Sequence, residues 1–435
     1  MSRAISALYF LFLATLFSRN LSLGSNAGPL GSVSPVQIMM LLTLGFSVTI
    51  AVLKAKVSST YLRTASLWFL LIAVYCFADS FSAIIHDDAS DALFTMRTRI
   101  ATIATFMLPF FVIRSVTDEK KAFIALGVSA VALASTVLLT ALDIYDFSEL
   151  GGRTARYESS RIFGVMLPRT SGILNDFGDI ASLYSVAAAI FIVFALQGSQ
   201  DRKGISIVSL ALLALISVAA IIPLSRNVWA ASAVSLATAL FLWGVVQRRR
   251  HFFISRFIVI SLIFCIVVLV FLSDWIIDSA LQMRADSSSA RVLQYQLAFD
   301  AFLDSPVVGV GVADCRIHGL DVHNVPLLVA CRGGLFALLP LLIICIAIPT
   351  VLVRDILFGH QSQEQKVNSA VALAGYAGFI VAGLLYPGGG ANSNEVTWGM
   401  LGFFSAVACR RSLAITSRAD GLAKQGRRSA LPGWQ

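Results

Sequence analysis

Long apolar runs, repeated from one end of the chain to the other, limit the possible folds more than any other feature. Runs of about 15 to 25 apolar residues, near the length a helix needs to cross a bilayer, recur throughout the 435 residues. Charged residues make up 13% of the chain and apolar residues 57%, whereas a typical soluble domain has about 25% charged residues. Within lipid, a helix satisfies all of its own backbone groups. We therefore predict an all-α polytopic membrane protein.

About twelve transmembrane helices are predicted. They cover residues 4–17, 37–53, 65–85, 99–114, 122–141, 177–197, 205–223, 228–246, 257–273, 325–353, 368–386 and 395–409. The first is interpreted as an anchor and not as a signal peptide, because no clear small-residue cleavage site follows it. We expect one transmembrane domain over residues 1–409, which includes polar loops 142–176 and 274–324, and a basic tail over residues 410–435.

The lysines indicate which side of the membrane each loop faces. Every lysine falls in loops or in the tail on one side of the twelve-helix arrangement. Because cytoplasmic loops carry an excess of Lys and Arg, we expect that side, with both termini, to be cytoplasmic. The net charge of +9 is then loop charge, so we expect the lipid bilayer as a partner and no nucleic acid.

Arginines are nevertheless frequent on the opposite, outer side. Loop 142–176 contains Arg161 and Arg169 and ends near Asn175; Arg291 lies in the second polar loop, and Arg226 lies in a short break between two spans. A guanidinium binds a phosphate through two parallel hydrogen bonds, which an ammonium cannot form. Anion binding is therefore one interpretation. Pairing with loop carboxylates, or for Arg226 contact with lipid headgroups, is the other.

The longest polar interval, residues 286–334, combines a helix with a turn. Serines 287–289 suit a helix N-terminus, apolar residues then recur at helical spacing through Leu303, and Pro306 ends the pattern. Gly309 and Gly311 follow and allow the chain to turn tightly. We expect a short amphipathic helix here, outside the membrane.

A histidine ends this interval where the next span begins. Of the two histidines in the interval, His318 and His323, only His323 is followed by asparagine, Asn324, at the mouth of a span. An imidazole with an ordinary pKa near 6.5 can accept a proton at neutral pH. His323 is our candidate general base, and a purely structural histidine is the alternative.

These elements together resemble the O-antigen ligase and O-antigen polymerase superfamily. The pair His323-Asn324 followed by Gly334 is similar to the family signature, and Ser225-Arg226 is similar to its Ser-Arg-Gly element. Arg291 with its helix resembles the segment upstream of the signature, and residues 169–175 resemble the segment that leads into the middle spans. The resemblance covers roughly residues 160–350. The chain departs from the family pattern at Asn227, Arg332 and Ala337.

The resemblance implies a metal-independent inverting glycosyltransferase in a bacterial inner membrane, with a GT-C-like fold and a site that faces the periplasm. Its donor would be a glycan on undecaprenyl diphosphate, and its acceptor a sugar hydroxyl on lipid A-core or on another lipid-linked glycan. His323 would be the base, with Arg226 and Arg291 on the diphosphate. Substrate-binding positions would be Asn324, Arg161, Arg169 and Asn175. No cofactor is implied.

A transporter or flippase of lipid-linked glycans is the alternative class. Such proteins carry charges or broken helices near the membrane midplane. Here Asp79 is the clear acidic residue inside a span, with Asp179 near a span end, and the other polar residues concentrate on one side. This distribution favours the enzyme.

Two cysteines, Cys315 and Cys331, fall near the outer side, where disulfides can form. Cys331 lies about two turns inside its span, which favours two free thiols over a bond.

Overall fold

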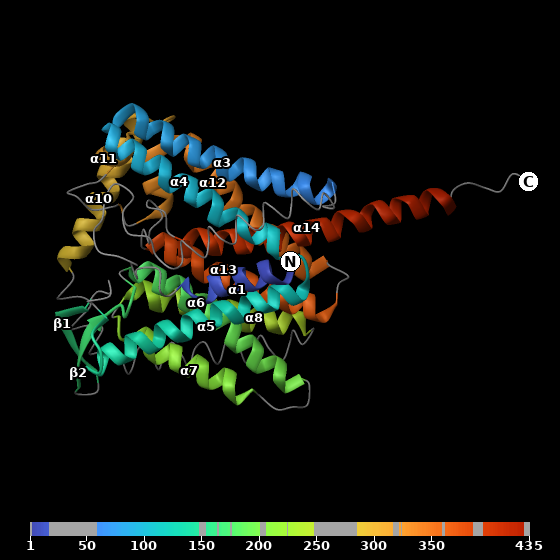
Figure 1. The fold of residues 1–435 in the computed structure, drawn as a ribbon, viewed down its shortest axis with the longest axis horizontal. Coiled ribbons are helices and arrows are strands. Elements are labelled where there is room, and N and C mark those ends of the chain that lie inside the picture. The colour runs from blue at the N-terminus through green and yellow to red at the C-terminus, as the bar shows by residue number, and fades with distance from the viewer. Residues whose placement is uncertain are drawn as a thin grey trace, which may run out of the picture.

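The computed structural model describes residues 2–16, 59–147, 154–162, 165–174, 176–200, 206–223, 225–247, 285–315, 322, 324–358, 362–385 and 395–429. These residues form a bundle of helices with one small antiparallel hairpin (Figure 1). The helices are α1 (Ser2–Ala14), α3 (Ser59–His86), α4 (Ala89–Val112), α5 (Val116–Ala141), α6 (Phe177–Gln200), α7 (Ile207–Ile221), α8 (Arg226–Val246), α10 (Ala285–Asp304), α11 (Gly311–Asp314), α12 (Val325–Phe358), α13 (Gln363–Leu385) and α14 (Glu395–Ser429). The strands are β1 (Thr154–Ile162) and β2 (Val165–Thr170).

The predicted spans agree with the helices wherever the structure describes them. Spans 37–53 and 257–273 lie outside the described residues, and each of the others overlaps a helix. Within the described residues, six helices are long and apolar enough to cross a membrane. They are Arg63–His86, Val116–Ala141, Phe177–Gln197, Asn227–Val246, Val325–Phe358 and Gln363–Leu384. The multi-pass α-helical class is confirmed, while the number twelve stays a prediction.

The bundle has two chemically different ends (Figure 1). The hairpin, α10 and α11 lie together at one end, here called the hairpin end, and the last turns of α14 leave from the other, here called the basic end. At the basic end, Lys120 of α5 lies 3.8 Å from Glu364 of α13. The segments predicted to lie outside the membrane on one side therefore gather at one end, as the loop alternation requires. Which end faces the cytoplasm stays a prediction.

Helix α5 begins at the basic end with a capping box. The Ser115 hydroxyl accepts the Asp118 backbone N–H at 3.1 Å, and the Asp118 carboxylate accepts the Ser115 backbone N–H at 3.0 Å. Each side chain thus satisfies a backbone donor that the first helical turn leaves free. This fixes the start of α5 just after the chain leaves α4.

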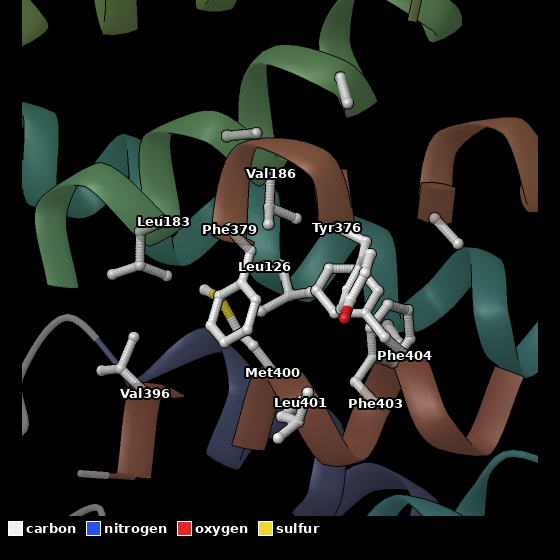
Figure 2. Packing of buried hydrophobic residues seen from close by; sticks show 14 of the residues in the cluster. Leu126, Leu183, Val186, Tyr376, Phe379, Val396, Met400, Leu401, Phe403 and Phe404 are labelled. Atoms are coloured by element: carbon white, nitrogen blue, oxygen red, sulfur yellow. The ribbon is translucent and has the colours of Figure 1, made fainter. Parts of the chain in front are cut away.

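Aromatic packing between α13 and α14 forms the centre of the core (Figure 2). The ring of Phe404 meets Tyr376 edge-on, with 5.5 Å between centroids, and lies 5.9 Å from Phe379. Leu126 of α5 and Val186 of α6 complete this part of the cluster. Edge-to-face aromatic pairs contribute about 0.5–1.5 kcal/mol beyond the area they bury. The core thus holds α14 between helices distant in sequence.

A buried ionic cluster joins four helices at the basic end. The Arg411 Nη2 lies 2.6 Å from Glu119 Oε2 of α5, and its Nε lies 3.4 Å from Asp355 Oδ2 of α12. The same Nε donates to Ser369 Oγ of α13 at 2.9 Å, and Arg410 Nε lies 3.0 Å from Glu119 Oε1. Arg411, Glu119 and Asp355 are each 0% exposed. α14 runs through this point without a break, so the first two arginines of the predicted tail are part of the packed bundle.

The outer loop 142–176, for which no strand was expected, contains the hairpin. β1 pairs antiparallel with β2, with Ala155 opposite Arg169 and Arg161 opposite Met166. Both strands are edges, so β2 can include Pro168, which cannot donate to a ladder. Few β-branched residues and an irregularity between Ala155 and Ser160 hide the period-two pattern from the sequence.

Candidate active site

The segment after α10, residues 305–315, folds back onto α12 and is here called the folded-back segment. α10 ends at Asp304, as the sequence predicts, and the chain then makes three backbone hydrogen bonds with α12. The Val310 N–H donates to the Cys331 carbonyl at 2.9 Å, and the Leu335 N–H donates to the Pro306 carbonyl at 2.8 Å. Gly309, with φ of 80°, lies so close to the backbone of α12 that a Cβ would overlap it. The predicted tight turn at the glycines is confirmed.

Helix α12 is kinked at Gly334, the glycine of the family signature. Its φ of 60° and ψ of −160° are not helical, and a Cβ there would overlap the Val307 carbonyl. The neighbouring Gly333 approaches α3, where a Cβ would stand 3.5 Å from the Asp79 Cα. The pair therefore admits the folded-back segment on one side and α3 on the other, as expected for close helix approach.

Asp87, at the end of α3, holds the start of α11. Its Oδ1 accepts the backbone N–H of Val312 at 3.0 Å and of Ala313 at 2.9 Å. These are the orphan donors of a helix N-terminus, and a carboxylate satisfies them while opposing their partial positive charge. Asp87 thus links the folded-back segment to α3, a role that an acidic residue at a helix end does not reveal without its partners.

Cys315 and Cys331 form a disulfide, with 5.9 Å between their Cα atoms. The sequence left this pairing open, and the bond is present although the depth of Cys331 favoured free thiols, because the folded-back segment lies along the first turns of α12 and brings Cys315 beside Cys331. A small second core surrounds the bond, here called the satellite core. Its buried members are Ala298, Cys315, Val322, Leu328 and Cys331.

Asn324 caps α12. Its Oδ1 accepts the Leu327 backbone N–H at 3.0 Å, and its Nδ2 donates to the Leu384 carbonyl at the end of α13 at 3.3 Å. A side-chain oxygen in this position satisfies one free N–H of the first turn. The asparagine of the signature therefore has a structural role that the sequence interpretation missed, and its role toward substrate stays a proposal.

Arg291 lies in α10 and is partly exposed. Burial raises the pKa of the Tyr295 phenol, and the positive charge of Arg291 opposes that rise. Tyr295 packs against the satellite core. Arg291 is thus close to a residue that packs against the same core as Val322.

Arg226 is the first residue of α8, at the hairpin end, as the sequence predicts for a residue that opens a span. The tight turn before it is closed by Trp229, whose Nε1 donates to the Ala220 carbonyl of α7 at 2.8 Å. Next to it, Asn227 is only 5% exposed. Neither amide atom of Asn227 has a hydrogen-bond partner among the residues that the structure describes.

The remaining predicted site residues are placed less completely. Arg161 lies on β1 and Arg169 on β2, both at the hairpin end. His323 and Asn175 lie outside the described residues, as do the side chains of Arg161, Arg169 and Arg226. The hairpin that carries Arg161 and Arg169 and the start of α8 that carries Arg226 therefore lie at the same end of the bundle. That these side chains meet in one site stays a prediction.

Asp79 is not a free acid inside the membrane, because two buried arginines pair with it. Its Oδ2 accepts the Arg99 Nε–H at 2.7 Å, and its Oδ1 lies 3.5 Å from Arg332 Nε. The three side chains are 2–3% exposed. Arg332, which departs from the family pattern, is thereby balanced by a residue of α3. Sequence reasoning offered only loop carboxylates as partners for the outer arginines.

A cavity of about 180 Å³ lies between α6, α12, α13 and α14. Its lining is mostly apolar and includes Val325 and Pro326, which directly follow Asn324, together with Gly383, Leu384 and Trp398. Within the described residues, no group of three or more His, Cys, Asp or Glu side chains could hold a metal ion.

The fold defines a multi-pass α-helical membrane protein in which Arg226 opens α8 and Arg291 lies in the interior of α10. Residues 211–342 match the family model of O-antigen ligase, which confirms the resemblance to the O-antigen ligase and polymerase superfamily. The matched segment contains Arg226, Arg291 and His323-Asn324. It supports a role of ligase or polymerase type in surface polysaccharide biosynthesis. A comparison with curated proteins found no match for the chain.

Proposed function

We propose that this protein transfers a glycan from undecaprenyl diphosphate to an acceptor sugar hydroxyl, at the periplasmic face of a bacterial inner membrane. The acceptor is lipid A-core in a ligase or a second lipid-linked glycan in a polymerase. The observation that carries the proposal is the family match over residues 211–342, which spans all three candidate catalytic residues. The ends of α8, α10 and α12 that carry or adjoin them all lie at the hairpin end.

The proposed reaction is a direct displacement at the anomeric carbon. The imidazole of His323 takes the proton of the acceptor hydroxyl, whose oxygen forms a bond to C1 of the donor sugar. The bond between C1 and the diphosphate oxygen breaks, and undecaprenyl diphosphate leaves with the electron pair. Attack opposite to the leaving group inverts the anomeric centre. Because the diphosphate is already a good leaving group, the proposal needs no metal.

Arginines stabilise the departing charge in this proposal. Arg226 and Arg291 offer bidentate donors to the diphosphate, and the free N–H groups of the first turn of α8 add a partial positive charge beside Arg226. The buried amide of Asn227 is a further donor at the same helix end. Arg161, Arg169 and Asn175 would contact the glycan.

The apolar cavity beside Asn324 suits the hydrocarbon part of the donor. Its volume of about 180 Å³ has room only for isoprene units near the diphosphate, and because its lining includes Val325, directly after Asn324, these units would bring the diphosphate toward that end of α12. This arrangement supports a lipid-linked donor over a soluble sugar nucleotide.

The test is glycan transfer in reconstituted vesicles with a lipid-linked donor and no added nucleotide. We expect His323→Ala to lower the rate by roughly 10²–10⁴-fold, as loss of a general base does. Arg226→Ala or Arg291→Ala should lower it by roughly 10²–10³-fold, and lysine at either position should restore little because a point charge lacks the bidentate geometry. A chelator should leave the wild-type rate unchanged.

His318→Ala is the matched control, since His318 lies in the same loop without the following asparagine. It should transfer at close to the wild-type rate. Wild-type activity in His323→Ala, or loss of wild-type activity with chelator, would contradict the mechanism. In cells, dead variants should accumulate lipid-linked glycan on the outer leaflet, whereas a flippase defect would trap it on the cytoplasmic leaflet.

A further inference from the structure

We propose that the Cys315–Cys331 disulfide and the satellite core are the positioning device of the catalytic loop, so that transfer requires the bond to be formed. The inference rests on the proposed function, because it concerns the placement of His323 as base. It goes beyond that function because it assigns a positioning role to Cys315, Cys331 and Val322, which do not contact substrate in the proposal.

The disulfide encloses the candidate base in sequence. It joins residues 16 apart in sequence, and His323 lies between them. The loop is therefore closed at its two ends by a covalent bond, one end on the folded-back segment and the other on α12. Without the bond, Cys315 stays near α12 through the backbone hydrogen bonds between residues 306–310 and α12 and through packing in the satellite core, while Asp87 ties α11 to α3.

The satellite core holds the residue that precedes the candidate base. Val322, the residue before His323, is 0% exposed and packs in the same cluster as Cys315 and Cys331. Asn324, the residue after His323, is fixed to α12 and to α13 by its two side-chain hydrogen bonds. The Asn324 N–H also donates to the Val322 carbonyl at 2.8 Å. Both neighbours of the candidate base are thus anchored, one of them by the disulfide cluster.

The satellite core also contacts the helix of Arg291. Ala298 of α10 is fully buried in the satellite core, and Tyr295 and Ala301 pack against it. Arg291 lies one turn before Tyr295 on the same helix. The core therefore sets the distance between α10, which carries Arg291, and Val322, the residue before the proposed base. A displacement of about 1 Å in such a site can lower a rate by about 10²-fold.

The experiment uses the full-length protein in vesicles, with Cys76, Cys265, Cys345 and Cys409 replaced by alanine so that only the pair remains. Without reductant, neither thiol should alkylate. After reduction both should alkylate, kcat should fall by roughly 10–100-fold, and KM for the donor should change by less than about threefold. Reoxidation should restore kcat. Because the protein is reduced after it has folded, a folding defect cannot produce this result.

Two variants separate positioning from general stability. Val322→Ala leaves the bond intact and should also lower kcat with little change in KM, whereas Leu339→Ala, at an exposed position elsewhere on α12, should not change kcat. Cys315→Ser/Cys331→Ser should match the reduced protein and gain nothing from an oxidant. The inference is overturned if both thiols alkylate without reductant, or if kcat is unchanged after reduction. In either case the proposed function stands as long as His323→Ala is inactive. A wild type that transfers no glycan in either redox state would overturn both.

Discussion

Replacing Asp79 by asparagine tests the buried charges near the hairpin end. The carboxylate is the shared partner of Arg99, at 2.7 Å, and of Arg332, at 3.5 Å. Asparagine keeps the size of the side chain and removes its charge. The two guanidinium groups then remain buried without the anion that joins α3, α4 and α12.

The magnitude follows from the burial. The three side chains are 2–3% exposed, so water cannot replace the lost anion as it would on a surface. Removing one partner of a buried ion pair typically destabilises a protein by about 3–5 kcal/mol. Since one carboxylate serves two arginines, we expect Asp79→Asn to lie at the upper end of that range. Replacing Arg332 by methionine instead leaves the Asp79–Arg99 pair intact, and should cost much less.

The assay is the free energy of unfolding in mixed micelles, for Asp79→Asn, Arg332→Met and the double variant. The double variant Asp79→Asn/Arg332→Met should recover part of the loss, since it removes one of the two cations that pair with Asp79. Asp88→Asn is the matched control, because Asp88 is exposed at the same end of α3 and its change should stay within about 0.5 kcal/mol. Equal losses for Asp79→Asn and Arg332→Met would refute the reasoning.

The other predictions concern single contacts. Gly334→Ala should destabilise by about 1–3 kcal/mol and slow transfer, because its φ of 60° and its contact with the Val307 carbonyl exclude a Cβ; melting and rate measurements check this. Asn324→Ala should cost about 0.5–2 kcal/mol as a lost cap, and Asn324→Ser should retain most of that stability in the same melting assay. Arg411→Met should cost about 3–5 kcal/mol, because it removes the cation beside buried Asp355 and one of the two arginines that pair with Glu119, with kcat per folded molecule unchanged. Asn227→Ala should leave stability equal or higher, since its buried amide has no partner in the described structure, but should lower the transfer rate.

The sequence was sufficient for features that depend on local patterns. Runs of apolar residues gave the helices, because a span needs length and composition and no specific partner. Pro306 and the glycines at 309 and 311 gave the end of α10 and the turn, because the backbone restrictions of proline and glycine are intrinsic to those residues. The assignment of Arg226 to the opening of a span succeeded for the same reason.

The sequence was insufficient where a residue's role depends on a distant partner. Asp79 pairs with a residue 20 positions later and with Arg332, and Arg411 meets Glu119 across 292 positions. Nothing local distinguishes these paired charges from solvated ones. Cys331 was misjudged because its depth was inferred from its position in an apolar run, whereas the kink at Gly334 and the folded-back segment bring Cys315 to it.

The contacts divide the described helices into two parts that should respond differently to mutation. One part is called the site unit, and the rest of the bundle is called the frame. The site unit is α10, the folded-back segment and the start of α12, and polar contacts attach it to the frame through Asp79, Asp87 and the Leu384 carbonyl. The Glu119–Arg411 cluster lies at the opposite end and contacts no part of that unit in the described structure. Because rigid attachment matters to a rate only where it sets distances between reacting groups, loss of Asp87 or of the Leu384 contact should change kcat more than stability. Loss of Arg411 should do the reverse, and the two ends should behave additively when combined.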